Sequence, residues 1–191
     1  MRALMASLAL MLSVCLPFLA ESAFAQSNVV PATQVITFHP AGATGAAVKG
    51  NCWTESIALQ RADAWRCMVG NAIFDPCFSA TPHAMSVICA AYPTHPVDMR
   101  VILAAPLPAH SAIHSTRPWS FVLGDGSYCV AFTGTIGLYH GLPMDYGCSN
   151  RWNVIGDPSA QSKIWYATVV TLNAQYQPVN VFVISVKALY H

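Results

Sequence analysis

The sequence predicts a mainly β fold, namely a β-rich α+β domain built as a small disulfide-linked sandwich or barrel with one or two short helices. Runs rich in β-branched and aromatic residues at 164–172 and 179–186 are typical of strands. Asp125-Gly126 lies between two apolar runs, which is a pattern typical of a β-hairpin turn. Six cysteines follow the N-terminal apolar stretch, and an even number is typical of a disulfide framework.

Residues 1–25 are predicted to form a cleavable signal peptide. Arg2 supplies a positive charge, residues 3–20 are largely apolar, and Ala23-Phe24-Ala25 has the small-x-small pattern of a cleavage site. We therefore expect the mature chain to begin at Gln26 and to be exported to the periplasm or the extracellular space.

A membrane anchor and a lipid attached at Cys15 are the alternatives for this segment. An anchor needs about 20 unbroken apolar residues, whereas Pro17 and Glu21 close the run here. Lipid attachment favours a small residue before the cysteine, and Val14 is bulky. We therefore expect no membrane span after cleavage.

Length and charge limit what the mature chain can be. Cleavage would leave 166 of the 191 residues, which fits an N-terminal arm at 26–49 and one disulfide-linked domain at 50–191. Charged residues make up 9% of the chain and the formal net charge is +1. Such a balance gives no electrostatic case for nucleic-acid binding.

The six cysteines are expected to form three disulfides: Cys52, Cys67, Cys77, Cys89, Cys129 and Cys148. The last two stand apart from the others, so we pair them with each other. The first four are assigned as Cys52–Cys67 with Cys77–Cys89, and Cys67–Cys77 with Cys52–Cys89 remains open, because spacing alone does not choose between them. Short Cys-x-x-Cys pairs typical of zinc sites are absent, so we expect no metal site.

The first half of the mature chain is predicted to hold short strands and one helix. Strands are expected at 35–38, 87–89 and 99–104. A helix is expected at 62–69, with Asp63 in its first turn and Gly70-Asn71 as its stop signal.

Hairpins are predicted in the second half of the chain. Residues 119–123 and 128–132 flank the Asp125-Gly126 turn, and residues 146–149 return beside them. Residues 164–172 and 179–186 are expected to pair as a C-terminal hairpin. Asp75 and Asp157 each precede a proline, so turns are expected there too.

Several motifs together resemble an uncharacterised group of exported bacterial proteins. They are NCWTES at 51–56, DAWRC at 63–67, GN at 70–71, DPCF at 75–78, VIC at 87–89, PW at 118–119, GDG at 124–126 with Cys129, YGC at 146–148 and KIW at 163–165. The resemblance covers most of residues 50–168 and implies bacterial export and a shared fold. No established activity comes with it, so it implies no catalytic residue.

Catalytic and metal-binding patterns are not evident. No nucleophile elbow, phosphate loop or His-Glu-x-x-His motif occurs. His140 and Cys148 faintly resemble the site of cell-wall L,D-transpeptidases, but that chemistry needs a free thiol. Four other histidines are read as solvated loop residues: His83, His95, His110 and His114. We expect no cofactor.

Trp65, Arg66 and Asp75 are the candidate binding residues. Tryptophan and arginine side by side are typical of a binding hot spot. The alternative is that Trp65 packs in the core while Arg66 pairs with Asp63 or Asp75. The sequence favours an exported, non-enzymatic binding or cell-envelope module with an unknown envelope or extracellular partner. An envelope hydrolase or transferase with a site assembled from distant residues, or an inhibitor of a secreted enzyme, are the other hypotheses.

Overall fold

The computed structural model describes residues 30–40, 42–43, 45–93, 98–109 and 115–191. The predicted signal peptide, with Cys15, therefore lies outside the described residues, as do His95, His110 and His114. Every regular element in the described part of the chain is a strand, so the mainly β fold is confirmed. No described segment forms a helix of the length and hydrophobicity needed to cross a membrane.

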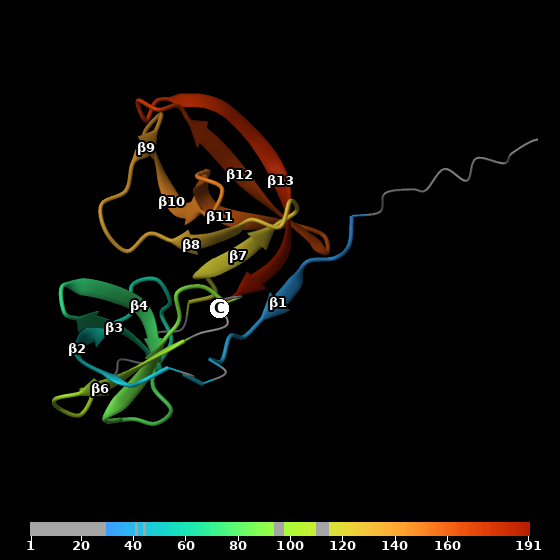
Figure 1. Ribbon diagram of the computed structural model, residues 1–191. Coiled ribbons are helices and arrows are strands. Elements are labelled where there is room, and N and C mark those ends of the chain that lie inside the picture. Colours follow the sequence, from blue (N-terminus) through green and yellow to red (C-terminus); the bar gives the residue numbers. More distant parts are fainter. Residues whose placement is uncertain (1–29, 41, 44, 94–97, 110–114) are drawn as a thin grey trace, which may run out of the picture.

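Two closed sheets make up the fold (Figure 1). The first barrel consists of five consecutive strands, β2 (Val48–Glu55), β3 (Ala64–Val69), β4 (Ala72–Phe78), β5 (Ser86–Cys89) and β6 (Met99–Leu103). Neighbours along the chain pair antiparallel, and β2 pairs parallel with β6 to close the barrel.

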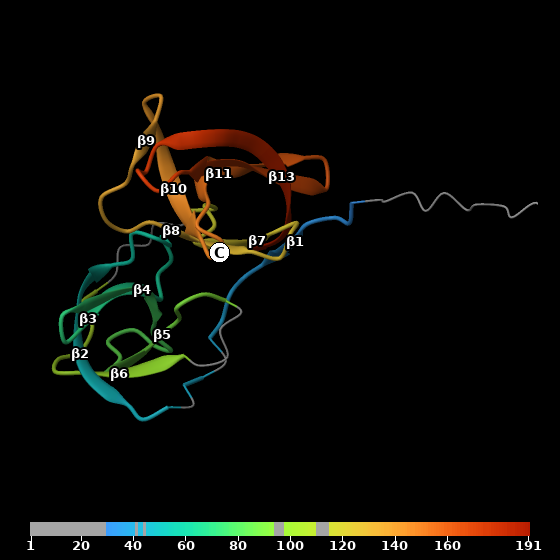
Figure 2. The same ribbon diagram turned by 45° about the horizontal axis from the view of Figure 1, so that its top comes forward.

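The second barrel takes up the C-terminal part of the chain. Its strands are β7 (Ser120–Leu123), β8 (Tyr128–Ala131), β10 (Leu142–Cys148), β11 (Asn153–Gln161), β12 (Ile164–Leu172) and β13 (Pro178–Tyr190). Pairing of β13 with β7 closes the sheet. Two short strands join it at the edges, β9 (Leu138–Tyr139) on β10 and β1 (Gln34–Ile36) parallel to β13. Figure 2 shows the strands of both sheets curving round.

The three disulfides each join directly opposed residues of neighbouring strands. They are Cys52–Cys67, Cys77–Cys89 and Cys129–Cys148, each with a Cα–Cα distance of 3.9 Å. The assigned pairing of the first four cysteines is therefore found, and the open alternative is not.

The helix predicted at 62–69 is wrong, because residues 64–69 form strand β3. Trp65 and Cys67 both face the interior of the first barrel, while Met68 is exposed. Residues two apart face the same side of a strand but lie about 200° apart on a helix. Gly70-Asn71, expected to stop a helix, instead forms the two-residue connection between β3 and β4.

The turns predicted at two of the aspartates are also wrong. Asp75 lies within β4 and Asp157 within β11. The proline that follows each of them also lies within that strand. The turn at Asp125 is confirmed, because its carboxylate accepts hydrogen bonds from the Ser127 amide at 2.9 Å and hydroxyl at 2.8 Å.

An aromatic cluster joins the two barrels and the N-terminal arm. Phe38 lies 5.4 Å from both Phe78 and Trp119, measured between ring centroids, and 6.4 Å from Tyr190. Phe78 belongs to β4 of the first barrel, whereas Tyr190 ends β13 of the second. The two closed sheets therefore share one apolar cluster.

Candidate functional site

Trp65 lies in the interior of the first barrel. Its side chain is 2% exposed, and its indole Nε1 donates to Ser79 Oγ at 3.2 Å. It packs in the same cluster as Cys67 and Cys77. Its indole N–H is satisfied and little of its ring is exposed, so Trp65 packs as a core residue of the barrel, and it also lines a small cavity of about 260 Å³.

Arg66 and Asp75 are brought together by the pairing of β3 with β4. Arg66 Nη1 lies 3.0 Å from Asp75 Oδ2, and the Asp75 side chain is only 1% exposed. Of the two partners considered for Arg66, Asp75 is the one found. Asp63 is instead held by Arg61, which donates through Nε and Nη2 at 2.5 and 2.9 Å.

Other groups complete the surroundings of the Asp75 carboxylate. Ser56 Oγ donates to Oδ1, and the Ile57 amide donates to Oδ2 at 3.2 Å. Burial raises the pKa of Asp75 above its ordinary value, while the hydrogen bonds from Ser56, Ile57 and Arg66 oppose that rise. The carboxylate is thus fully engaged inside the protein, and its role is to hold Arg66.

The indole that Arg66 contacts at the surface is Trp53. The guanidinium carbon lies 5.9 Å from the Trp53 ring centroid, within cation–π range. Trp53 is 45% exposed, a large open fraction for so apolar a side chain. Sequence reasoning missed this residue, although a signal was present. Trp53 follows Cys52 and Arg66 precedes Cys67, and that disulfide points inward, so both neighbours point outward.

Two further apolar side chains extend this surface. Met68 and Ile73 are opposed residues of β3 and β4, and they are 44% and 52% exposed. Met68 lies two residues from Arg66 and therefore on the same side of β3. We name the surface formed by Trp53, Arg66, Met68 and Ile73 the Trp53 face. It combines three exposed apolar side chains with one positioned guanidinium, and the exposed Asn51, which is opposed to Met68, borders it.

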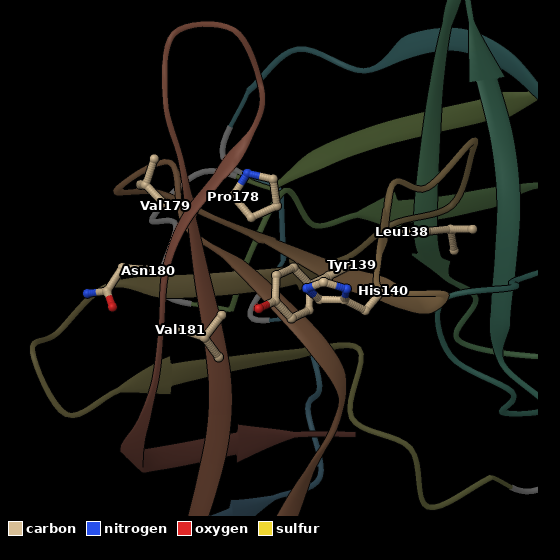
Figure 3. A pocket seen from close by; sticks show the side chains of 7 residues that line it. All are labelled: Leu138, Tyr139, His140, Pro178, Val179, Asn180 and Val181. Carbon is tan, nitrogen blue, oxygen red and sulfur yellow. The ribbon is translucent and has the colours of Figure 1, made fainter.

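A cavity of about 610 Å³ lies in the second barrel between the β9–β10 hairpin and the start of β13 (Figure 3). Its lining residues are Leu138, Tyr139, His140, Pro178, Val179, Asn180 and Val181. The rings of Tyr139 and His140 meet edge to face at 4.4 Å. Among the described residues that line the cavity there is no carboxylate or thiol, so His140 has no acidic or thiol partner among them.

A second cavity, of about 520 Å³, holds a histidine and a carboxylate in one lining, His39 and Asp63. A catalytic acid–base pair would need them within about 3 Å of each other. The Asp63 carboxylate is instead engaged by Arg61. Among the described residues, no histidine hydrogen-bonds to a carboxylate.

A polar network surrounds Arg117 in the second barrel. Its guanidinium pairs with Asp145 at 2.9 Å and Asp157 at 2.8 Å, and its Nε donates to Tyr146 Oη at 3.2 Å. Burial, together with the hydrogen bond to Asp157, raises the pKa of Tyr146 above its ordinary value, so the phenol stays protonated. These groups pair and hydrogen-bond with one another, so their role is to stabilise the second barrel.

The six cysteines of the described structure are all bonded in disulfides, so none of them is a free thiol. The sulfurs of Cys67, Cys77 and Cys89 lie within 4.8 Å of one another, a spacing that could suit a metal. All three are bonded in disulfides, and a metal ligand must be a thiolate. Cys148 is bonded to Cys129, so the transpeptidase-like pairing with His140 has no free thiol.

Comparison with protein-family models, with curated proteins and with solved structures gives no match for this chain.

Proposed function

We propose that this chain is an exported, non-enzymatic binding module of the bacterial cell envelope, and that it engages a protein partner through the Trp53 face. The observation that carries the proposal is the exposed indole of Trp53 stacked with Arg66, which a buried carboxylate holds in place. Tryptophan and arginine are the residue types most enriched at interface hot spots.

Preorganisation supports this role for the face. Arg66 is tied to Asp75, which is fixed in turn by Ser56 and the Ile57 amide. A partner would therefore meet a guanidinium whose rotamer is already set, which lowers the entropy lost on binding.

The charge of the face indicates the chemistry of the partner. Asp75 neutralises Arg66, and Trp53, Met68 and Ile73 carry no charge. Such a surface suits a protein patch of apolar side chains with a carbonyl or carboxylate at its rim to meet Arg66. A strongly charged polymer would find little to bind.

Export supports the same proposal, because disulfides persist in oxidising compartments. Three bridges hold the two barrels. We expect the protein recovered from bacterial envelope or culture medium to begin at Gln26, measured as the intact mass. A mass that still includes residues 1–25 would remove the export part of the proposal.

The function itself is tested by partner capture from envelope extract on three parallel columns. They carry the wild-type protein, Trp53→Ala and Tyr176→Ala, the last being an aromatic control that is 85% exposed elsewhere. We expect at least one envelope protein to bind the wild-type and control columns and to be lost from Trp53→Ala. Identical capture on all three columns would refute the Trp53 face as the binding site.

A further inference from the structure

The cavity of about 520 Å³ beside the first barrel combines an apolar floor with an uncompensated cation at its rim. We name it the Arg100 pocket, after that residue. The residues that matter for the argument are His39, Asp63, Phe78, Ser86, Ile88 and Arg100. Its volume falls within the range of small-molecule sites in proteins, about 300–1,000 Å³.

The sheet places the floor and the cation in one row. Phe78 of β4 is opposed to Ile88 of β5, and Ile88 is opposed to Arg100 of β6. Directly opposed residues lie on the same side of a sheet. The phenyl ring, the aliphatic side chain and the guanidinium therefore follow one another across three strands and face the pocket together.

The floor is rigid on its inner side. Phe78 is 3% exposed and lies 5.4 Å from Phe38 and 6.3 Å from Trp119, between ring centroids. The guanidinium of Arg61 lies 4.9 Å from the same ring. A ligand would meet a preformed apolar surface at this end of the pocket.

The carboxylate of the lining already has a cationic partner that lies outside the lining. Asp63 is compensated by Arg61, which also donates to the carbonyls of Phe38 at 2.9 Å and His191 at 3.2 Å. Arg100 is exposed, and within the described residues it has neither a hydrogen bond nor an ion pair. Arg100 is therefore the charged group of the lining that remains for a ligand, and the imidazole of His39 adds a further polar group to the same lining.

We infer that the Arg100 pocket binds a small organic anion, with a carboxylate or phosphate group on Arg100 and an apolar body on Phe78 and Ile88. A guanidinium presents parallel N–H donors that match either oxyanion. His39 and the Ser86 hydroxyl are within the same lining to meet its remaining oxygens. This site is independent of the Trp53 face, which is formed by other side chains of β2, β3 and β4.

Calorimetric titration of the oxidised mature protein tests the inference with four probes, namely benzoate, phenyl phosphate, inorganic phosphate and benzyl alcohol. We expect benzoate or phenyl phosphate to bind at least tenfold more tightly than both inorganic phosphate and benzyl alcohol. The tighter binder of these two shows whether the pocket prefers a carboxylate or a phosphate. Absence of binding by both aromatic anions would overturn the inference, and so would equal binding of inorganic phosphate, because the floor would then contribute nothing.

Variants place the binding in this pocket. Arg100→Gln should lower the affinity for the tighter-binding anion at least tenfold. Ala80→Trp should prevent binding of that anion, because the indole would fill the pocket from an exposed lining position. Arg151→Gln, an exposed arginine of the other half of the chain, and Trp53→Ala should leave the affinity unchanged. Equal weakening by Arg100→Gln and Arg151→Gln would show binding by general charge and would refute the site.

Discussion

Asp75 is a buried carboxylate that fixes Arg66, an arginine whose side chain is 14% exposed. The Asp75 side chain is 1% exposed, and it receives hydrogen bonds from Ser56, Ile57 and Arg66. Burying a charge is costly unless partners of this kind satisfy it. The benefit to the protein is the orientation of Arg66 beside Trp53.

The raised pKa of Asp75 predicts how it affects stability with pH. Because the folded protein binds this proton more tightly than the unfolded chain does, acidification favours the folded state at this residue. Its contribution is fully present below the ordinary carboxyl pKa and is lost as the pH rises through the folded-state pKa. We therefore expect the unfolding free energy of wild type, minus that of Asp75→Asn, to increase as the pH falls from about 7 to about 3.5.

Guanidinium denaturation of both proteins across this pH range measures the difference. Other carboxyls titrate alike in the two proteins and cancel. A difference that is flat, or that grows with rising pH, would contradict the assigned direction of the Asp75 pKa.

Tyr146 joins the groups around Arg117 through one hydroxyl. That oxygen accepts from Arg117 Nε at 3.2 Å and lies within hydrogen-bond distance of the Pro118 carbonyl at 2.9 Å and Asp157 Oδ1 at 2.7 Å. Removing it leaves the buried Pro118 carbonyl without this donor, so Tyr146→Phe should cost about 1–3 kcal/mol in the free energy of unfolding. Tyr176→Phe, on an 85% exposed side chain, should change it by less than about 0.5 kcal/mol. Equal stability of the two variants in denaturant titrations would show that the network contributes nothing.

At the scale of the strands, each disulfide fastens two neighbours that are already hydrogen-bonded. Cys129 of β8 is opposed to Cys148 of β10, and 19 positions separate them along the chain. Cross-linking restricts the unfolded chain, and a loop of this length is worth about 3 kcal/mol in the chain-entropy account.

Replacing both Cys129 and Cys148 with alanine should therefore lower the free energy of unfolding by about 2–4 kcal/mol. Non-reducing peptide mapping of the variant should still show Cys52–Cys67 and Cys77–Cys89. Wild-type peptides with a free Cys148, or no loss of stability in the double variant, would contradict this role of the bridge.

Local signals explain which elements the sequence predicts well. The Asp125-Gly126 turn and the β-branched runs of β12 and β13 act over a few residues, so those hairpins could be predicted. The helix prediction at 62–69 is wrong because Trp65 and Cys67, two residues apart, both face the barrel interior, and Gly70-Asn71 connects two strands instead of ending a helix. The pairings that close the two barrels, β2 with β6 and β7 with β13, join strands far apart in the sequence. No local sequence signal predicts them.

The candidate site follows the same division between local and distant signals. Trp53 and Arg66 each adjoin a cysteine of the inward Cys52–Cys67 bridge, so their outward position was within reach of the sequence once that bridge was assigned, whereas the register shift that opposes Arg66 to Thr54 was not. The Arg100 pocket combines the arm with three strands of the first barrel. His39 and Arg100 lie far apart in the sequence, and only the fold brings them into one lining.

At the scale of the whole molecule, the shared aromatic cluster argues that the two barrels unfold together. Phe78 of the first barrel packs among Phe38 and Trp119, and Arg61 ties the first barrel to the backbone at Phe38 and His191. Cooperative unfolding requires such shared contacts. It would also fit the single domain predicted at 50–191.

Differential scanning calorimetry should show one transition for the wild-type protein, with equal calorimetric and van't Hoff enthalpies. Phe78→Ala should lower the free energy of unfolding by about 3–5 kcal/mol and separate the transition into two. Phe132→Ala, on a 43% exposed ring, should keep a single transition. Two transitions in the wild type would show that the barrels are independent domains.

The central claim is that the Trp53 face binds a protein partner. The most direct measurement is an isothermal titration of the captured envelope protein into wild type, Trp53→Ala and Tyr176→Ala. A hot-spot residue is worth at least about 2 kcal/mol, so Trp53→Ala should raise the Kd about 30-fold or more, while Tyr176→Ala should match wild type. Equal Kd values for wild type and Trp53→Ala would contradict the claim.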